Sequence, residues 1–232
     1  MISPVILAAA GLFFLHLIFE TLATFVKYNF SSLGRHMVGI SVSNILAMIS
    51  RGLVALFGIA MAIVIESGVS DIDVYVVLFS VSSALAAAAS LALSNLKIFE
   101  AASSRLGGTG DADSTWSRLK LGNNNEKSLV PIRGLVAVAL GTQFVSIVIA
   151  YGVCFVLPER RLFVISLVPL ISALGALVTI LWVEPRLARM IDDDNRKGYA
   201  ASREFLRARA VSFLFSSGLL ILLPWVVPKS WL

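Results

Sequence analysis

The sequence predicts an all-α, polytopic integral membrane protein with about six transmembrane helices, and three observations lead to this fold class. First, the chain is apolar: hydrophobic residues make up 58% of the 232 residues, and the mean hydropathy is +0.89. Second, charged residues make up only 14%. A soluble domain carries roughly a quarter charged residues, because its surface must meet water. The third observation is that the apolar residues gather in runs of about twenty, the length that a helix needs to cross about 30 Å of hydrocarbon.

Six predicted spans follow one another along a single transmembrane domain that covers residues 1–232. They are residues 4–26, 37–65, 74–98, 134–157, 162–183 and 211–227. The fourth and fifth are separated only by the turn Pro158-Glu159-Arg160-Arg161, without which they would form a run too long for one crossing. The start of the chain lacks a basic n-region, so we expect a retained first helix rather than a cleaved signal peptide.

The distribution of Lys and Arg predicts the orientation. With the N-terminus outside, the cytoplasmic segments hold fifteen of the nineteen basic residues, the outer segments hold three, and Arg51 lies inside a span. The positive-inside rule therefore places both termini on the outer side and residues 99–131 and 184–210 in the cytoplasm. The first of these segments is rich in Gly, Asn and Asp and is expected to be a flexible loop.

The 184–210 segment mixes charged and apolar residues at helical spacing, which predicts an interfacial helix broken near residues 195–198. Two interpretations fit this pattern. One is a basic stretch that only sets the topology, and the other is a segment that meets anionic lipid head groups. Each half of the chain holds three spans, so the halves enter the membrane in opposite directions, the geometry of a 3+3 inverted repeat. Sequence support for the repeat is limited to Ser-Ala-Leu at 83–85 and at 172–174.

The first span carries ionisable residues on one face. His16 and Glu20 are four residues apart, and Thr24 and Lys27 continue the same stripe. Such groups inside a span are costly and seldom face lipid. They could form a structural contact between helices, but we favour a role in lining a pathway or binding a ligand.

The second span has Arg51 near its middle, where a cation costs roughly 2.5 to 3.5 kcal/mol even on the lenient insertion scale. Arginine does not deprotonate, so Arg51 needs a carboxylate, a water-filled cavity or an anionic ligand. Comparing depths at 1.5 Å per residue, and allowing for side chains that lean toward the helix N-terminus, we expect Arg51, His16, Glu20 and Asn44 to face a common cavity. An ion pair between Arg51 and Glu20 is the structural alternative.

The third span presents a stripe of serines that ends in a lysine, namely Ser80, Ser83, Ser90, Ser94 and Lys97. Small residues allow close helix approach in lipid, whereas the alternative is a hydrated groove with Lys97 at its cytoplasmic mouth. The single cysteine, Cys154, lies in an apolar run and is expected to be a buried packing residue.

Enzyme signatures are missing from the sequence. It has two histidines, His16 and His36, and no HExxH, GxSxG or Walker pattern, so we expect no metal, no cofactor and no enzyme of these classes. The basic residues sit in loops between apolar runs, which argues against nucleic acid as a partner.

Two blocks carry a resemblance to a known family. The first span reads HLIFETLATFVKY and the second contains SVSNILAMISR, a pair that resembles the Amj-type lipid II flippases of bacteria. The matching positions are His16, Glu20, Thr21, Asn44, Ile45, Ser50 and Arg51. Glu184-Pro185 and the acidic pair Asp192 and Asp193 extend the likeness over most of the chain. Residues 27–30, 94–97 and the 101–131 loop depart from the family pattern, which bears on the identity of the glycan.

The resemblance implies a flippase that moves an undecaprenyl-diphosphate-linked glycan from the cytoplasmic to the outer leaflet of the bacterial plasma membrane. Its substrate would be lipid II, the peptidoglycan precursor, and a planar guanidinium suits its phosphate oxygens. The residues expected to bind this substrate are Arg51, His16, Glu20, Asn44, Lys27, Lys97 and Ser94.

Three rival functions stay open. They are a flippase for another polyprenyl-linked oligosaccharide, an intramembrane enzyme acting on a polyprenyl diphosphate with Glu20 and His16 as acid and base, and a non-catalytic scaffold. Six helices enclose a small cavity for a glycan head group, so a homodimer is also considered.

Overall fold

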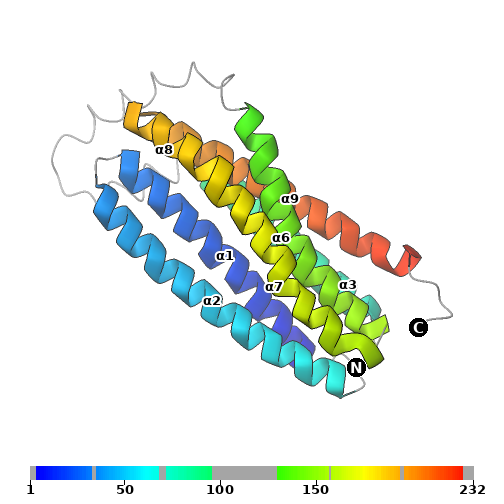
Figure 1. Ribbon diagram of the computed structural model, residues 1–232. Helices are drawn as coiled ribbons and strands as arrows, with labels where there is room; N and C mark the ends of the chain where they lie inside the picture. The colour runs from blue at the N-terminus through cyan, green and yellow to red at the C-terminus, as the bar shows by residue number, and fades with distance from the viewer. Residues whose placement is uncertain are drawn as a thin grey trace.

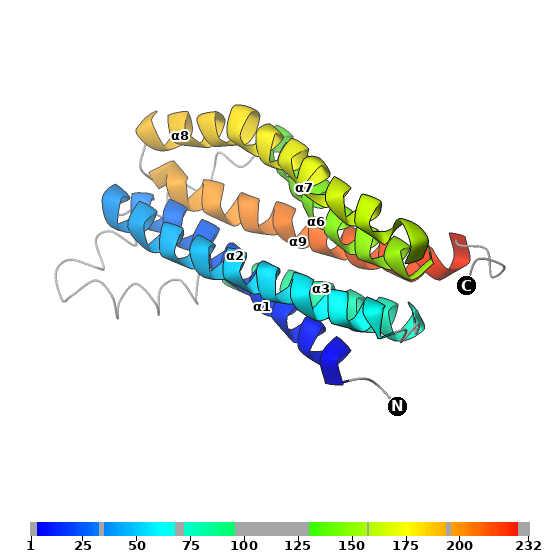
Figure 2. The ribbon, with the colours of Figure 1, turned by 60° about the horizontal axis from the view of Figure 1, so that its bottom comes forward.

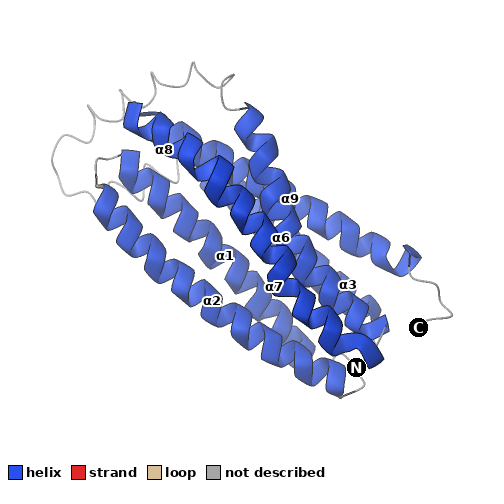
Figure 3. Ribbon diagram, viewed as in Figure 1, coloured by secondary structure: helices blue, strands red, loops and turns tan. Residues whose placement is uncertain are grey.

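The computed structural model describes residues 4–32, 35–67, 72–95, 130–156, 158–193 and 196–226, and every structural statement below concerns this part of the chain. These residues form long helices, without a strand among them (Figure 1, Figure 3). Five of the helices are long and apolar enough to cross a membrane. The predicted all-α, polytopic membrane fold is therefore confirmed.

The helices follow the predicted order. The first half of the chain forms α1 (Pro4–Ser32), α2 (His36–Glu66) and α3 (Ile72–Leu93). The second half forms α6 (Val130–Val156), the short 3₁₀ helix η2 (Pro158–Arg160), α7 (Arg161–Val178), the π-helical turn η3 (Thr179–Val183), α8 (Glu184–Asp193) and α9 (Arg196–Val226). Residues 99–129 of the predicted 99–131 loop, and Lys97, lie outside the described residues.

The predicted end of the fifth span at Glu184-Pro185 is wrong, because the helix continues through this pair into α8. The backbone N–H of Glu184 bonds to the carbonyl of Thr179, five residues earlier, within the π-helical turn. Pro185 follows as the second residue of α8, directly after this π-helical turn, a local adjustment that accommodates proline within a continuous membrane helix. The wide turn therefore lets the helix pass the proline.

The sixth span also differs from its predicted range of 211–227. Helix α9 begins at Arg196, and its membrane-length apolar part runs over Ser202–Leu222. Residues 202–210, expected in a cytoplasmic segment, are thus part of this helix. Alanine, arginine and leucine, which dominate the stretch, are strong helix formers. Hydropathy alone began the span too late in the chain, because it counts each arginine of residues 202–210 against a membrane helix.

Two hairpins flank a central helix pair. Helices α1 and α2 pack along each other, as do α6 and α7, and α3 packs against α9 between them. Helix α1 also contacts α3 and α9, whereas α6 contacts mainly α9. The start of α1 and the end of α9 lie at the same end of the bundle (Figure 2). Each half thus forms a hairpin and a third helix, and the two third helices pack against each other.

The core between the hairpins holds a cluster of aromatic rings. Phe13 of α1 lies 5.3 Å, centroid to centroid, from both Phe57 of α2 and Phe79 of α3, and Tyr75 lies 4.5 Å from Phe79. All four side chains are buried. Such tilted pairs contribute about 0.5 to 1.5 kcal/mol each beyond the apolar area that they bury. This cluster holds α1, α2 and α3 in register and so fixes the polar residues that follow Phe13 along α1.

Candidate functional site

The polar stripe of α1 begins with His16, which links α1 to α2 by hydrogen bonding. The ring is buried, and its Nδ1 lies 2.6 Å from Ser50 Oγ and 3.2 Å from the Ser50 carbonyl oxygen. The Ser50 hydroxyl also lies 3.3 Å from the His16 carbonyl oxygen. Ser50 therefore faces α1, and the next residue, Arg51, is turned by about 100° around α2 and points elsewhere.

Glu20, one turn further along α1, pairs with Arg209 of α9. Arg209 Nη2 donates to Glu20 Oε2 over 2.6 Å, and its Nη1 lies 3.5 Å from Thr24 Oγ1. The same carboxylate oxygen is 3.7 Å from His16 Nε2. Arg209 is only 1% exposed, and its guanidinium carbon Cζ lies over the rings of Phe144 and Phe213, at 5.3 and 5.4 Å from their centroids. Charge-assisted hydrogen bonding and cation–π attraction together offset the burial of this charge.

The stripe ends in contacts with the second half of the chain. Lys27 Nζ donates to Glu184 Oε1 over 2.7 Å, and both side chains are partly exposed, at 36% and 43%. Asn29 Nδ2 donates to Ser202 Oγ over 3.1 Å. The polar face of α1 therefore runs from the middle of the bundle to the end where α8 begins, where Lys27 is partly exposed and Asn29 is buried.

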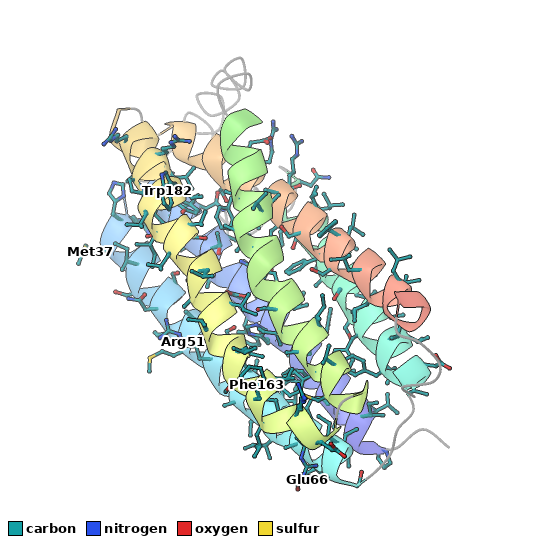
Figure 4. The ribbon with its side chains drawn as sticks, turned by 45° about the vertical axis from the view of Figure 1, so that its right-hand side comes forward. Met37, Arg51, Glu66, Phe163 and Trp182 are labelled. Carbon is teal, nitrogen blue, oxygen red and sulfur yellow. The ribbon has the colours of Figure 1, made fainter. Side chains whose placement is uncertain are left out.

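Arg51 has a different environment. It is the sixteenth residue of the 31-residue α2, about 23 Å from either helix end, and its side chain is exposed. It forms neither an ion pair nor a hydrogen bond with any residue that the structure describes. Figure 4 shows it about halfway along α2 between Met37 and Glu66, with α7, marked by Phe163, and η3, marked by Trp182, passing beside α2 in that view. Asn44, two turns earlier, is exposed as well.

These positions correct the expected common cavity. Glu20 and His16 face the inside of the bundle, whereas Arg51 and Asn44 are on exposed parts of α2, so the four do not converge. The alternative ion pair between Arg51 and Glu20 is also wrong, because Glu20 pairs with Arg209. Lys27 shares the stripe of His16 and Glu20, as its spacing predicts.

The serine stripe of α3 serves helix packing. Ser80 Oγ donates to the Ser217 carbonyl over 3.4 Å and Ser217 Oγ returns a bond to the Ser80 carbonyl over 3.1 Å, joining α3 to α9. Ser90 and Ser94 are buried and donate to carbonyls of their own helix. These contacts favour close packing over the hydrated groove. Cys154 is buried, as expected.

Arg209 is the site residue that the sequence argument missed, since it was assigned to a cytoplasmic segment by the positive-inside rule. One signal pointed to it. A carboxylate in the first span needs a cation, and Arg209 is flanked by Ala208, Ala210 and Ser212, the small residues that allow close helix approach.

No cluster of three His, Cys, Asp or Glu side chains suited to a metal ion occurs among the described residues. Comparison with family models, curated proteins and solved structures gives no match to this chain. The fold and the site together define a multi-pass membrane protein with an internal ion pair and an exposed cation halfway along a span.

Proposed function

We propose that this protein is a flippase that moves a lipid with an anionic, diphosphate-linked head group across the membrane, and that its substrate is lipid II. The observation that carries the proposal is Arg51, an exposed guanidinium at the centre of α2 without a protein partner among the described residues. The resemblance of the first two helices to Amj-type flippases names the substrate. Movement is from the cytoplasmic to the outer leaflet of a bacterial plasma membrane.

The argument from Arg51 concerns the cost of its charge. A guanidinium at this depth costs roughly 2.5 to 3.5 kcal/mol on the insertion scale and cannot reduce that cost by losing its proton. Arg209 shows how this chain stabilises a structural cation, with a carboxylate at 2.6 Å and two aromatic rings. Arg51 lacks such support, so a ligand is the natural source of compensating charge. A diphosphate offers paired oxygens that match the planar fork of arginine.

The cytoplasmic end of the α1 stripe supplies a first contact for the head group. Lys27 and Glu184 are partly exposed where α1 ends, on the side that the charge distribution assigns to the cytoplasm. Thr24 and Glu20 lie further in, and the Glu20 side chain is still partly exposed. A head group that leaves Lys27 therefore meets polar groups before it reaches the depth of Arg51.

Complementation tests the proposal directly. Cells depleted of their own lipid II flippase should grow when they express this chain, and purified protein in vesicles should move lipid II between leaflets without changing its mass. Arg51→Ala should abolish both results. Arg186→Ala, which removes an exposed arginine on α8, is the matched control and should retain them. Failure of the wild-type chain to complement or to move lipid II would refute the lipid II assignment.

The same vesicles separate the rival functions. Transfer of another polyprenyl-linked oligosaccharide, but not lipid II, would show that the reaction class is right and the glycan wrong. A lipid product of altered mass would identify an enzyme. A chain that neither moves nor alters these lipids would fit a scaffold.

Orientation is tested by cysteine labelling after Cys154→Ser. Ser67→Cys, just after α2, should react with an impermeant reagent in intact cells, because the proposal places this end of the bundle outside. Arg35→Cys, just before α2 at the opposite end, should be protected. The reverse pattern would invert the direction of transport proposed here.

A further inference from the structure

A side-opening apolar groove lies in the second half of the chain, away from the polar stripe of α1. Residues of α6, α7 and α9 line it, and its volume is about 640 Å³. Ligand pockets in proteins usually measure about 300 to 1,000 Å³. Val138, Val211 and Phe215 are exposed at its rim, so the groove is open toward the surrounding lipid.

The lining selects an apolar occupant. Of the thirteen described residues that line the groove, only Ser146 and Ser212 have polar side chains. Ser212 Oγ donates to the Ala137 carbonyl over 2.8 Å, and Ser146 also has an interaction within the protein. A sugar or phosphate would find no charged side chain among these residues, whereas a hydrocarbon chain needs none.

The length of the groove distinguishes between hydrocarbon chains. Its α6 residues run from Ala137 to Val153, which is about 24 Å along the helix axis. One leaflet contributes only about half of the 30 Å hydrocarbon core, so an acyl chain anchored at one surface reaches about 15 Å. Helices α7 and α9 contribute to the groove from within their membrane-length segments. A chain that fills the groove therefore has to extend beyond the middle of the bilayer.

We propose that this α6–α7–α9 groove holds the polyprenyl chain of the transported lipid. The inference rests on the proposed function and adds a binding site for the tail of the substrate. Lipid tails are as apolar as the lining, so burial by itself gives little preference inside a bilayer. Selection comes from van der Waals contact along a long, shaped surface, which a polyprenyl chain can occupy from end to end and an acyl chain only in part.

Two glycines of α6 provide a matched test. Gly141 lines the groove, and a Cβ placed there meets no atom within 4 Å, so Gly141→Leu should fold and fill the groove. Gly134 has the same free space two turns earlier on the same helix but does not line the groove, so Gly134→Leu is the control. Val138→Trp, at the exposed rim, is a second way to narrow the groove without disturbing the core.

The measurement uses the purified full-length chain in phosphatidylcholine vesicles with undecaprenyl phosphate that carries a photoreactive group on its chain. Irradiation followed by peptide mass spectrometry should locate cross-links on groove residues of α6, α7 and α9. Gly141→Leu and Val138→Trp should each reduce this labelling about tenfold, which corresponds to about 1.4 kcal/mol of binding free energy. Gly134→Leu should label like the wild type.

Two outcomes would overturn the inference. One is groove labelling that neither substitution changes. The other is equal labelling by a phospholipid with the same photoreactive group on an acyl chain, which would make the groove a general lipid contact. Because undecaprenyl phosphate has no glycan and the assay needs no transport, the result is independent of the proposed function. Groove labelling without lipid II transfer would refute only the function, and transfer without groove labelling would refute only the inference.

Discussion

The α1–α2 hairpin and the α6–α7 hairpin occupy corresponding places in the two halves of the chain but present different chemistry. The first hairpin carries His16, Glu20, Lys27 and the exposed Arg51. The second hairpin, with α9, lines an apolar groove. A transported lipid also has two such parts, a charged head group and an apolar tail. Under the proposed function, each half of the chain would serve one part of the substrate.

The two halves are nevertheless linked by charge. Glu20 belongs to the first half, and its partner Arg209 comes from the last helix. Lys27 and Glu184 form a second pair across the same division. Arg51 is in the first half and has no such partner among the described residues. Pairs of this kind join the two halves, whereas in the proposed function the cation of Arg51 remains for the ligand. The predictions below separate these two uses of charge.

The largest expected effect follows from breaking the internal pair. Glu20→Gln should destabilise the protein by about 3 to 5 kcal/mol, because it leaves Arg209 buried without a compensating charge. The double variant Glu20→Met, Arg209→Met should recover most of this stability, since two apolar side chains of similar size replace both charges. Denaturation of the purified variants in detergent measures both changes. A double variant as unstable as Glu20→Gln would contradict a structural role for the pair.

The next prediction concerns Arg51, whose substitution should change transport but not stability. Arg51→Ala should insert and fold like the wild type, because the exposed side chain makes no bond to a described residue, yet it should lose lipid II transfer. Arg51→Lys should also transfer poorly, since an ammonium cannot bind a diphosphate through a planar fork. The readout is initial transfer rate at matched protein amounts. An Arg51→Ala protein with the wild-type rate would exclude Arg51 from the substrate site.

The sequence predicts the placement of some of these charged residues but not of others. The four-residue spacing of His16 and Glu20 placed both on one face of α1 because helical periodicity is a local property. The pairing of Glu20 with Arg209 is not local, since 189 residues separate them. The environment of Arg51 could not be predicted either. Helix α2 is apolar on all sides, so its sequence does not tell which face meets α1 and which faces outward.

A smaller effect is expected where α1 and α2 approach most closely. A Cβ added to Gly39 would lie 2.7 Å from the Cβ of Phe30 and 3.2 Å from the Lys27 carbonyl oxygen. Gly39→Ala should therefore destabilise the hairpin by about 1 to 3 kcal/mol, the usual range for overpacking. Gly52→Ala, on the same helix with no atom within 4 Å of the added Cβ, is the control and should be neutral or slightly stabilising. Thermal unfolding in detergent measures the difference, and equal melting temperatures would contradict the close approach.

The smallest stability effect should come from the pair between Lys27 and Glu184, although its partners lie on different halves. Both side chains are more than a third exposed, so water and salt screen their attraction, and pairs of this kind contribute about 0 to 1 kcal/mol. Lys27→Ala should therefore barely change unfolding, and the small change should vanish at high salt. If Lys27 also receives the head group, Lys27→Ala should slow lipid II transfer, whereas Glu184→Gln should not, because it leaves the cation in place. Equal loss of transfer in both variants would assign the pair a structural role in joining the halves instead.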